Sequence, residues 1–166
     1  MSGKRKQPRY VIDPLEEEEQ KDVVKYLDRL LPAYPAIHPL FFVTLNGAKL
    51  QGGGKAMNKI KPQGFVAGVH DLIFLHGRGG FFYMTLEMKQ KTDYKISENQ
   101  LEFQAAAKKN GGYSIFGRGF GEAKEHIDHY VSMPTTQELL IRAVCELERK
   151  NYDKALKILH GITNQW

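Results

Sequence analysis

Residues 68–89 read GVHDLIFLHGRGGFFYMTLEMK and contain the most informative pattern for the fold. Two apolar, β-prone runs, 69–75 and 81–88, flank the segment 76–80, which contains three glycines. Apolar runs joined by a short glycine-rich segment are typical of a β-hairpin. The sequence therefore predicts two antiparallel strands that are joined by a turn at 76–80.

The register of this hairpin decides where its charged residues point. If the turn centres on Gly79, Asp71 lies directly opposite Glu87, with the two Cβ atoms about 5 Å apart. Glu87 and Lys89 are two residues apart on one strand, so their side chains project from the same face. A turn shifted by one pairing step would point Asp71 to the other face. The centred register predicts two carboxylates side by side with an ammonium next to them.

Two neighbouring carboxylates on mainly apolar strands are unfavourable unless a positive charge neutralises them. Oxygen ligands of this kind suit a hard divalent cation such as Mg²⁺ or Mn²⁺. Such an ion polarises a phosphoryl oxygen and lowers the pKa of a bound water. Lys89 could orient that water or stabilise the charge that grows on the phosphate. The alternative interpretation is an exposed salt bridge between Glu87 and Lys89 beside an isolated Asp71.

Patterns outside the hairpin predict a mixed α/β fold followed by a pair of helices. Helical spacing of apolar residues, two capping boxes and breaks at proline and glycine set the helix limits. The expected order is a helix from 13 that ends before 32, strands at 40–45, 69–75 and 81–88, a helix from 97 to 110, a strand at 113–116, a helix at about 122–130, and two short helices from 135 and from 151, the last running through 159.

The composition fits one intracellular domain. A chain of 166 residues with 42% apolar residues can bury a core without disulfides, and the lone Cys145 cannot form an internal bridge. No apolar run follows the basic N-terminus, and none approaches the roughly 20 residues that span a bilayer. We therefore expect a cytoplasmic protein without a membrane partner.

Basic residues gather in one part of the chain. Between residues 49 and 95 there are eight Lys or Arg and three Asp or Glu, a difference of five that equals the net charge of the whole chain. Such a cluster favours a phosphate backbone as partner. The triglycine at 52–54 is not a nucleotide-binding P-loop, because Lys49 and Ala56 stand where that motif requires Gly and Ser or Thr. The lysines expected to contact DNA are Lys49, Lys55, Lys59, Lys61 and Lys91.

Asp71 followed by Glu87-x-Lys89 matches the PD-(D/E)xK nuclease signature. Over residues 14–131 the chain resembles the virus-type replication–repair nuclease (VRR-NUC) family of that superfamily. The remaining features that carry the resemblance are, in order, Glu16-x-x-x-Gln20, Gly64, Gly68-Val-His-Asp71-Leu-Ile, Leu86-Glu-Met-Lys89, Ser97-x-x-Gln100, Gly112-Tyr113, and Gly119-Phe-x-Glu-Ala123 through Ile127 and Tyr130.

The resemblance implies a restriction-endonuclease-like core, a mixed sheet flanked by helices, as the nuclease domain at 13–131. A flexible basic arm at 1–12 and a C-terminal helical extension at 132–166 complete the expected organisation. The family implies a Mg²⁺- or Mn²⁺-dependent DNA endonuclease of phage or bacterial origin. It also implies a preference for branched, flap or Holliday-junction DNA, and a homodimer, because cutting both strands of a junction needs two active sites. The C-terminal helical pair is a candidate for the dimer interface.

Carried over by position, Asp71 and Glu87 are metal ligands, the Met88 backbone carbonyl is a third, and Lys89 is the catalytic lysine. Gln100 supports the site from the following helix, a role compatible with its place in the capping box.

The resemblance also implies an acid from the first helix, Glu16, that reaches the metal directly or through a water. Glu19 lies close to the same inward stripe, and spacing does not exclude it. One position departs from the family, because His70 stands where proline usually precedes the aspartate. His70 is either a structural substitution or a further contact to phosphate or metal.

Two rival functions stay open from the sequence. The first is a nucleic-acid-binding module that keeps the fold but does not cleave. The second is a nuclease subunit that acts only within a larger recombination or packaging complex. The intact set of Asp71, Glu87 and Lys89 argues against the first, because a binding module has no reason to keep two acids near a phosphate.

Overall fold

The computed structural model describes residues 14–44, 64, 66–92 and 94–163. Their elements follow the predicted order, while the predicted arm at 1–12 lies outside the described residues. The elements are α1 (Pro14–Leu30), the short 3-10 helices η1 (Leu31–Ala33) and η2 (His38–Leu40), β1 (Phe41–Val43), β2 (Leu72–Phe74), β3 (Tyr83–Lys89), α3 (Glu98–Lys109), β4 (Gly112–Arg118), α4 (Gly119–Ser132), α5 (Thr136–Glu148) and α6 (Tyr152–Thr163).

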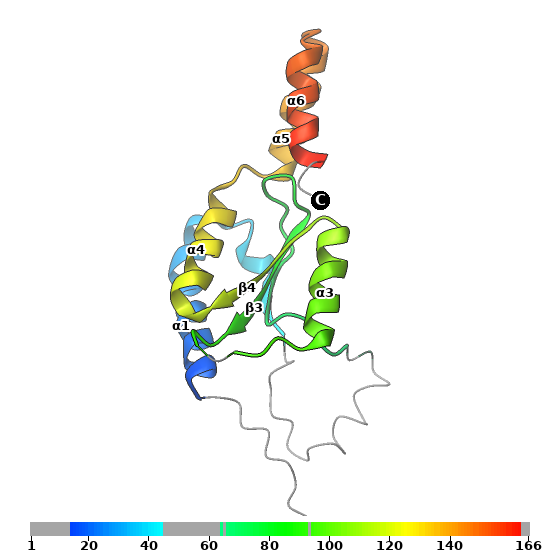
Figure 1. The fold of residues 1–166 in the computed structure, drawn as a ribbon. Helices are drawn as coiled ribbons and strands as arrows, with labels where there is room; N and C mark the ends of the chain where they lie inside the picture. Colours follow the sequence, from blue (N-terminus) through cyan, green and yellow to red (C-terminus); the bar gives the residue numbers. More distant parts are fainter. Residues whose placement is uncertain (1–13, 45–63, 65, 93, 164–166) are drawn as a thin grey trace, which may run out of the picture.

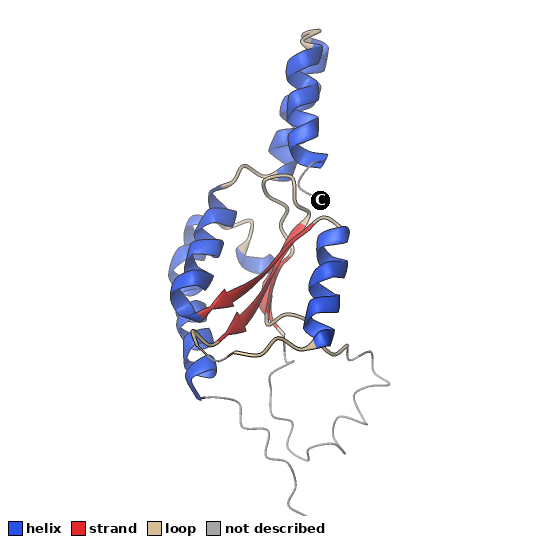
Figure 2. Cartoon of the chain, in the orientation of Figure 1, coloured by secondary structure: helices blue, strands red, loops and turns tan. Residues whose placement is uncertain are grey.

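The four strands form one mixed sheet in the order β1-β2-β3-β4. The β1–β2 and β2–β3 pairs are antiparallel, and the β3–β4 pair is parallel. A parallel pair needs a crossover connection, which α3 supplies. Helices α1 and α4 cover one face of the sheet and α3 covers the other (Figures 1 and 2). The predicted fold class, a mixed sheet flanked by helices, is confirmed.

The hydrophobic core lies between the sheet and the α1–α4 layer. Met84, Leu86 and Met88 alternate along β3 and are completely buried. They pack with apolar side chains from the two helices, since residues two apart on a strand share a face. The helix residues in this cluster include Val23 and Leu27 of α1 and Ala123, Ile127 and Tyr130 of α4.

The predicted hairpin register is confirmed. Leu72 pairs with Leu86 and Phe74 pairs with Met84, which centres the hairpin on Gly79. Asp71 immediately precedes β2, so the same register carried one step further sets it opposite Glu87.

The turn that sets this register is tied to the end of α4. The Arg78 guanidinium donates through Nη1 to the carbonyls of Val131 and Met133, both at 2.7 Å, and lies 5.3 Å over the ring centre of Tyr34. Gly79 has a φ of +64°, a conformation that favours glycine, and a Cβ there would meet the Met133 sulfur at 2.1 Å. The turn is therefore held by contacts from outside the hairpin.

Strand β2 is shorter than predicted because the chain before it bends. Thr44 holds this bend, since its N–H donates to the Asp71 carbonyl at 2.7 Å and its hydroxyl donates to the His70 carbonyl at 2.8 Å. The other predicted limits shift by a few residues: β4 and α4 meet at Arg118 and Gly119, and α6 runs to Thr163 instead of 159.

The predicted C-terminal helical pair is present, and both predicted capping boxes form. Lys150, with φ +58°, marks the predicted break between α5 and α6. The two helices pack against each other and stand out beyond the sheet (Figure 1). In the part of the chain that the structure describes, no helix is long and apolar enough to cross a membrane.

We predict that Arg78→Met destabilises the fold. Methionine keeps an apolar side chain but removes the two charge-assisted hydrogen bonds to the carbonyls of Val131 and Met133. The expected loss in free energy of unfolding is about 2 to 3 kcal/mol. Urea unfolding measures it, with Arg142→Met on the exposed surface of α5 as the matched control. Equal stability of the two variants would mean that the turn is not anchored through Arg78.

Candidate active site

The candidate site lies on the face of β3 that is turned away from the core. Thr85, Glu87 and Lys89 alternate with the core residues of β3, so they face the α3 side of the sheet. All three are nearly inaccessible to solvent. One strand therefore separates an apolar face from a polar, buried one.

Asp71, Glu87 and Lys89 come together there. The Met88 N–H donates to Asp71 Oδ2 at 2.8 Å, which places the Asp71 carboxylate against β3 between its two charged residues. Lys89 Nζ lies 2.9 Å from Glu87 Oε1. Asp71 is 8% exposed, Glu87 3% and Lys89 5%. The alternative of an exposed salt bridge is therefore wrong, because the ion pair is buried.

Gln100 joins the site from the first turn of α3. Its Oε1 accepts from the Ser97 N–H at 2.9 Å, which closes the capping box, and its Nε2 donates to Glu87 Oε1. Both roles predicted for Gln100 coexist. Because the capping box fixes the Gln100 backbone and its Oε1, the Nε2 that contacts Glu87 has a defined position at the start of α3.

The electrostatics of the site leave room for a further positive charge. Burial raises the pKa of the Asp71 carboxyl above its usual range, although the Met88 N–H and the Lys89 charge act in the opposite direction. One ammonium beside two ionised carboxylates leaves a net charge of −1. Buried charges are unfavourable unless they are paired, so the donor chemistry of the site fits a divalent cation.

A metal here would have few side-chain ligands. The described residues contain no group of three or more His, Cys, Asp or Glu side chains that could hold an ion. Asp71, Glu87 and the Met88 carbonyl would supply the protein ligands. This fits Mg²⁺, which keeps several waters and is usually bound by one or two carboxylates plus substrate phosphate. Mn²⁺ accepts the same oxygen donors.

His70, next to Asp71, lies in a buried polar network. Its ring is completely buried between Phe103 of α3 and Phe116 of β4. Its Nδ1 is 3.1 Å from the Thr85 hydroxyl, which is hydrogen-bonded in turn to the Ser114 hydroxyl at 2.7 Å. Burial lowers the pKa of His70 to about 4, so the ring is neutral near pH 7. These contacts favour the structural alternative for His70, in which its ring supports the chain beside Asp71.

The sequence analysis did not identify Thr85 and Ser114 as members of this buried network. The signal for Thr85 was its place two residues before Glu87, on the same face of β3. Ser114 had no local signal, because it reaches the network through the parallel pairing of β4 with β3, where it lies opposite Thr85.

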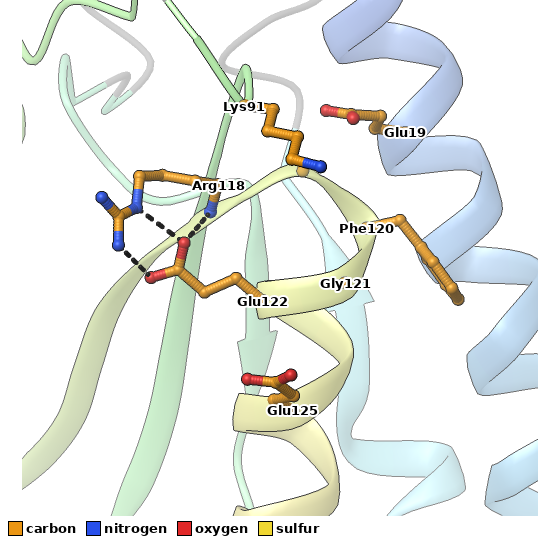
Figure 3. A pocket seen from close by; sticks show the side chains of 8 residues that line it. Glu19, Lys91, Arg118, Phe120, Gly121, Glu122 and Glu125 are labelled. Carbon is orange, nitrogen blue, oxygen red and sulfur yellow. Dashed lines mark hydrogen bonds and ion pairs between the residues drawn. The ribbon is translucent and has the colours of Figure 1, made fainter.

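A polar pocket of about 670 Å³ opens where β3 and β4 end (Figure 3). Lys91 and Arg118 line it, together with Glu19 from α1 and residues of the first turns of α4. Arg118, the register partner of Lys89, is oriented by Glu122 through contacts of 2.7 Å and 3.2 Å. Arg118 is a further basic residue near the site that sequence reasoning missed.

Of the two candidate acids on α1, the structure describes the side chain of Glu19 alone. Glu19 lies against Gly119, and its Oε2 is buried with no hydrogen-bond partner among the described residues. The side chain of Glu16 lies outside the described residues. The same holds for four of the predicted DNA-binding lysines, Lys49, Lys55, Lys59 and Lys61, whereas Lys91 is exposed at the pocket.

A solved structure described as a "VRR_NUC domain protein" superimposes on this chain with a TM-score of 0.59 at 19% sequence identity. The match covers 75% of this chain and 93% of that chain. No family model matches the sequence, and no curated protein matches it. The chain therefore shares the fold of a VRR_NUC domain, which agrees with the PD-(D/E)xK-like core expected from the sequence.

We predict that His70 makes the protein sensitive to acid. The native pKa of about 4 lies below the ordinary value of 6.5, so the unfolded state binds a proton that the native state does not. Stability is therefore complete above pH 6.5 and falls as the pH drops from 6.5 to 4, by about 3 kcal/mol in all.

Denaturant unfolding in EDTA at a series of pH values measures this loss in wild type and in His70→Gln. The glutamine variant should lose less stability than wild type over that interval. His160→Gln, at an exposed histidine of α6, should follow wild type. Parallel curves for wild type and His70→Gln would show that His70 is not held neutral.

Proposed function

We propose that this protein is a divalent-metal-dependent nuclease that hydrolyses phosphodiester bonds of DNA. The observation that carries the proposal is the buried set of Asp71, Glu87 and Lys89, with Gln100 hydrogen-bonded to Glu87. A buried ion pair with an additional acid contributes little to stability, so a chemical role explains it better than a structural one. The shared fold with a VRR_NUC domain protein supports the same conclusion.

Asp71 and Glu87 would hold the ion together with the Met88 carbonyl. A bound Mg²⁺ or Mn²⁺ supplies Lewis-acid polarisation of the phosphate and a water of lowered pKa. Lys89, held 2.9 Å from Glu87, would orient the attacking water or stabilise charge on the phosphate. Gln100 fixes the Glu87 carboxylate. His70 does not touch substrate in this scheme.

The DNA would approach the edge of the sheet where β3 and β4 end. Lys91 and Arg118 are exposed there and line the same pocket (Figure 3). The basic stretch between 49 and 95 gives the same part of the chain a positive balance that favours a phosphate backbone. We propose Lys49, Lys55, Lys59, Lys61 and Lys91 as its DNA contacts.

The preferred substrate is proposed to be branched DNA, such as flaps or Holliday junctions. Cutting both strands of a junction requires two active centres, and a homodimer would supply them. The process that the enzyme serves is proposed to be DNA repair or recombination in a bacterial or phage-infected cell.

The cleavage assay uses labelled linear, flap and four-way-junction DNA with Mg²⁺, with Mn²⁺ or with EDTA. Wild type should cleave with either metal and stop in EDTA. Lys89→Ala should lose about 10²- to 10³-fold in rate, because it removes the cation beside the reacting phosphate. Lys109→Ala, at an exposed lysine at the end of α3, is the matched control and should cleave like wild type.

Each result has one meaning. Cleavage that persists in EDTA would contradict the metal mechanism, and equal rates for wild type and Lys89→Ala would contradict the catalytic role of Lys89. DNA binding by wild type without cleavage under any metal would identify a non-cleaving module. Equal cleavage of linear and branched DNA would remove the substrate preference alone.

The position of α1 limits which acid, Glu16 or Glu19, could reach the metal. Helix α1 covers the face opposite Glu87, so its acid must reach around the edge of the sheet (Figure 1). Glu19 lies beside Gly119 at that edge, and Glu16 is about one helical turn further along α1. We propose Glu16 as the acid that completes the metal shell, because Glu16-x-x-x-Gln20 is the pattern that resembles the VRR-NUC family, although Glu19 is the acid placed at the edge.

Glu16→Gln should raise the Mg²⁺ concentration for half-maximal cleavage by about 10-fold or more, as expected for lost support of a metal ligand shell. Glu19→Gln, one turn away on the same stripe, should change it by less. The measurement is the cleavage rate across a Mg²⁺ titration. A larger shift for Glu19→Gln would transfer the role to Glu19.

A further inference from the structure

Helices α5 and α6 form a hairpin with a thin interior. The residues buried between them include Ala143 and Glu146 of α5 and Ala155 and Ile162 of α6. Glu146 accepts from Lys154 at 2.8 Å and from the Asn151 amide at 3.0 Å, which locks the connection. Two of these four residues are alanines and one is a glutamate, so the two helices bury little hydrophobic surface against each other. Short helices depend on tertiary packing for their stability, so the hairpin would gain from a further apolar contact.

Among the described residues, the hairpin meets the core at its start. The Thr136 hydroxyl donates to the Phe81 carbonyl at 2.6 Å, and the Thr136 N–H donates to the Gly77 carbonyl at 3.0 Å. Beyond this point the helices stand clear of the sheet and of its flanking helices (Figure 1). The described part of the core therefore leaves most of the hairpin surface uncovered.

One side of the hairpin is apolar. Leu140, Val144 and Leu147 follow one another at i, i+4 and i+7 on α5, and Ile141 borders them. The other large exposed apolar residues, Tyr152 and Leu156, form a pair at i and i+4 on α6. On each helix, the apolar stripe is offset from the buried face in the same direction around the helix axis when the helix is followed from its N-terminus to its C-terminus. Because the two helices run antiparallel, the two stripes lie on the same side of the hairpin. This surface, here named the apolar side, is formed by Leu140, Ile141, Val144, Leu147, Tyr152 and Leu156.

The opposite side of the hairpin is charged. Its residues are all exposed, and they follow the same helical geometry with the reverse rotation. They are Glu138, Arg142, Arg149, Lys154 and Lys157. Exposed apolar residues are therefore concentrated on one side of the hairpin and are not spread evenly over its surface.

We propose that the apolar side binds the apolar side of a second copy of this chain, so that two hairpins form a four-helix bundle. Side-by-side packing of two amphipathic helical pairs is the arrangement that four-helix bundles use. A two-fold pairing is self-complementary, because the same patch contacts itself.

The size of the apolar side fits this partner. Its six side chains are 41–59% exposed. At about half exposure each, six large residues present a substantial part of the roughly 800 Å² that each partner contributes to a standard interface. The polar rim of an ordinary interface supplies the remainder.

The charge of the hairpin also favours a second copy over DNA. Residues 136–163 contain five Lys or Arg and four Asp or Glu, a net charge of +1, whereas the whole chain carries +5. Two such hairpins meet with little like-charge repulsion. An apolar surface on a hairpin of net charge +1 provides little positive charge for binding a phosphate backbone.

Sedimentation equilibrium of the full chain, without DNA or metal, measures the assembly. At about 20 µM wild type should have twice its chain mass of 18.9 kDa. The double variant Val144→Glu/Leu156→Glu places two charges on the apolar side and should weaken the dimer by about 100-fold or more. Both positions are about half exposed in the single chain, so the variant should keep its fold, checked by circular dichroism.

Two controls give the comparison its specificity. Leu101→Glu introduces the same charge at a half-exposed leucine of α3, and Arg142→Glu alters the charged side of the hairpin. Both should remain dimeric. A monomeric wild type, or a double variant as dimeric as wild type, would overturn the proposal. The outcome is independent of the nuclease proposal, because the cleavage-deficient Lys89→Ala should dimerise like wild type.

Discussion

The arrangement at the site depends on how β2 pairs with β3. A slip of one residue would move Asp71 to the other face of the sheet, where Met84, Leu86 and Met88 form the core. The pairing is fixed at the turn, where Arg78 is bonded to two carbonyls near the end of α4. It is fixed along the strands by the alternation of apolar and polar residues on β3. The same constraint that buries the core therefore brings the second carboxylate to Glu87.

The two faces of β3 meet opposite requirements. The core face needs only apolar packing, whereas the other face buries an ion pair and a further acid. Protein groups partly satisfy these charges, since Lys89 and Gln100 both contact one oxygen of Glu87 and the Met88 N–H contacts Asp71. The raised pKa of Asp71 indicates that this satisfaction is incomplete. A surface optimised only for stability would carry apolar side chains here, so we regard the set as functional.

Much of this could be predicted from sequence, because it depends on local periods and turns. The centre of the hairpin at Gly79 gave the Asp71–Glu87 pairing by counting, and the capping box placed Gln100 at the start of α3. The His70–Thr85–Ser114 network could not be predicted in this way, because its members are brought together by strand pairing across 15 to 44 residues. The bend held by Thr44 shortened β2 for the same reason.

In the proposed mechanism Asp71 and Glu87 share one divalent cation. A crystal grown with Mn²⁺ shows whether they do, because the anomalous signal locates the ion independently of activity. We expect one peak at about 2.0–2.5 Å from oxygens of both Asp71 and Glu87, with the Met88 carbonyl in the same shell. We expect no such peak in Asp71→Asn. Mn²⁺ bound elsewhere, with none between these two carboxylates, would mean that the two acids do not form a metal site.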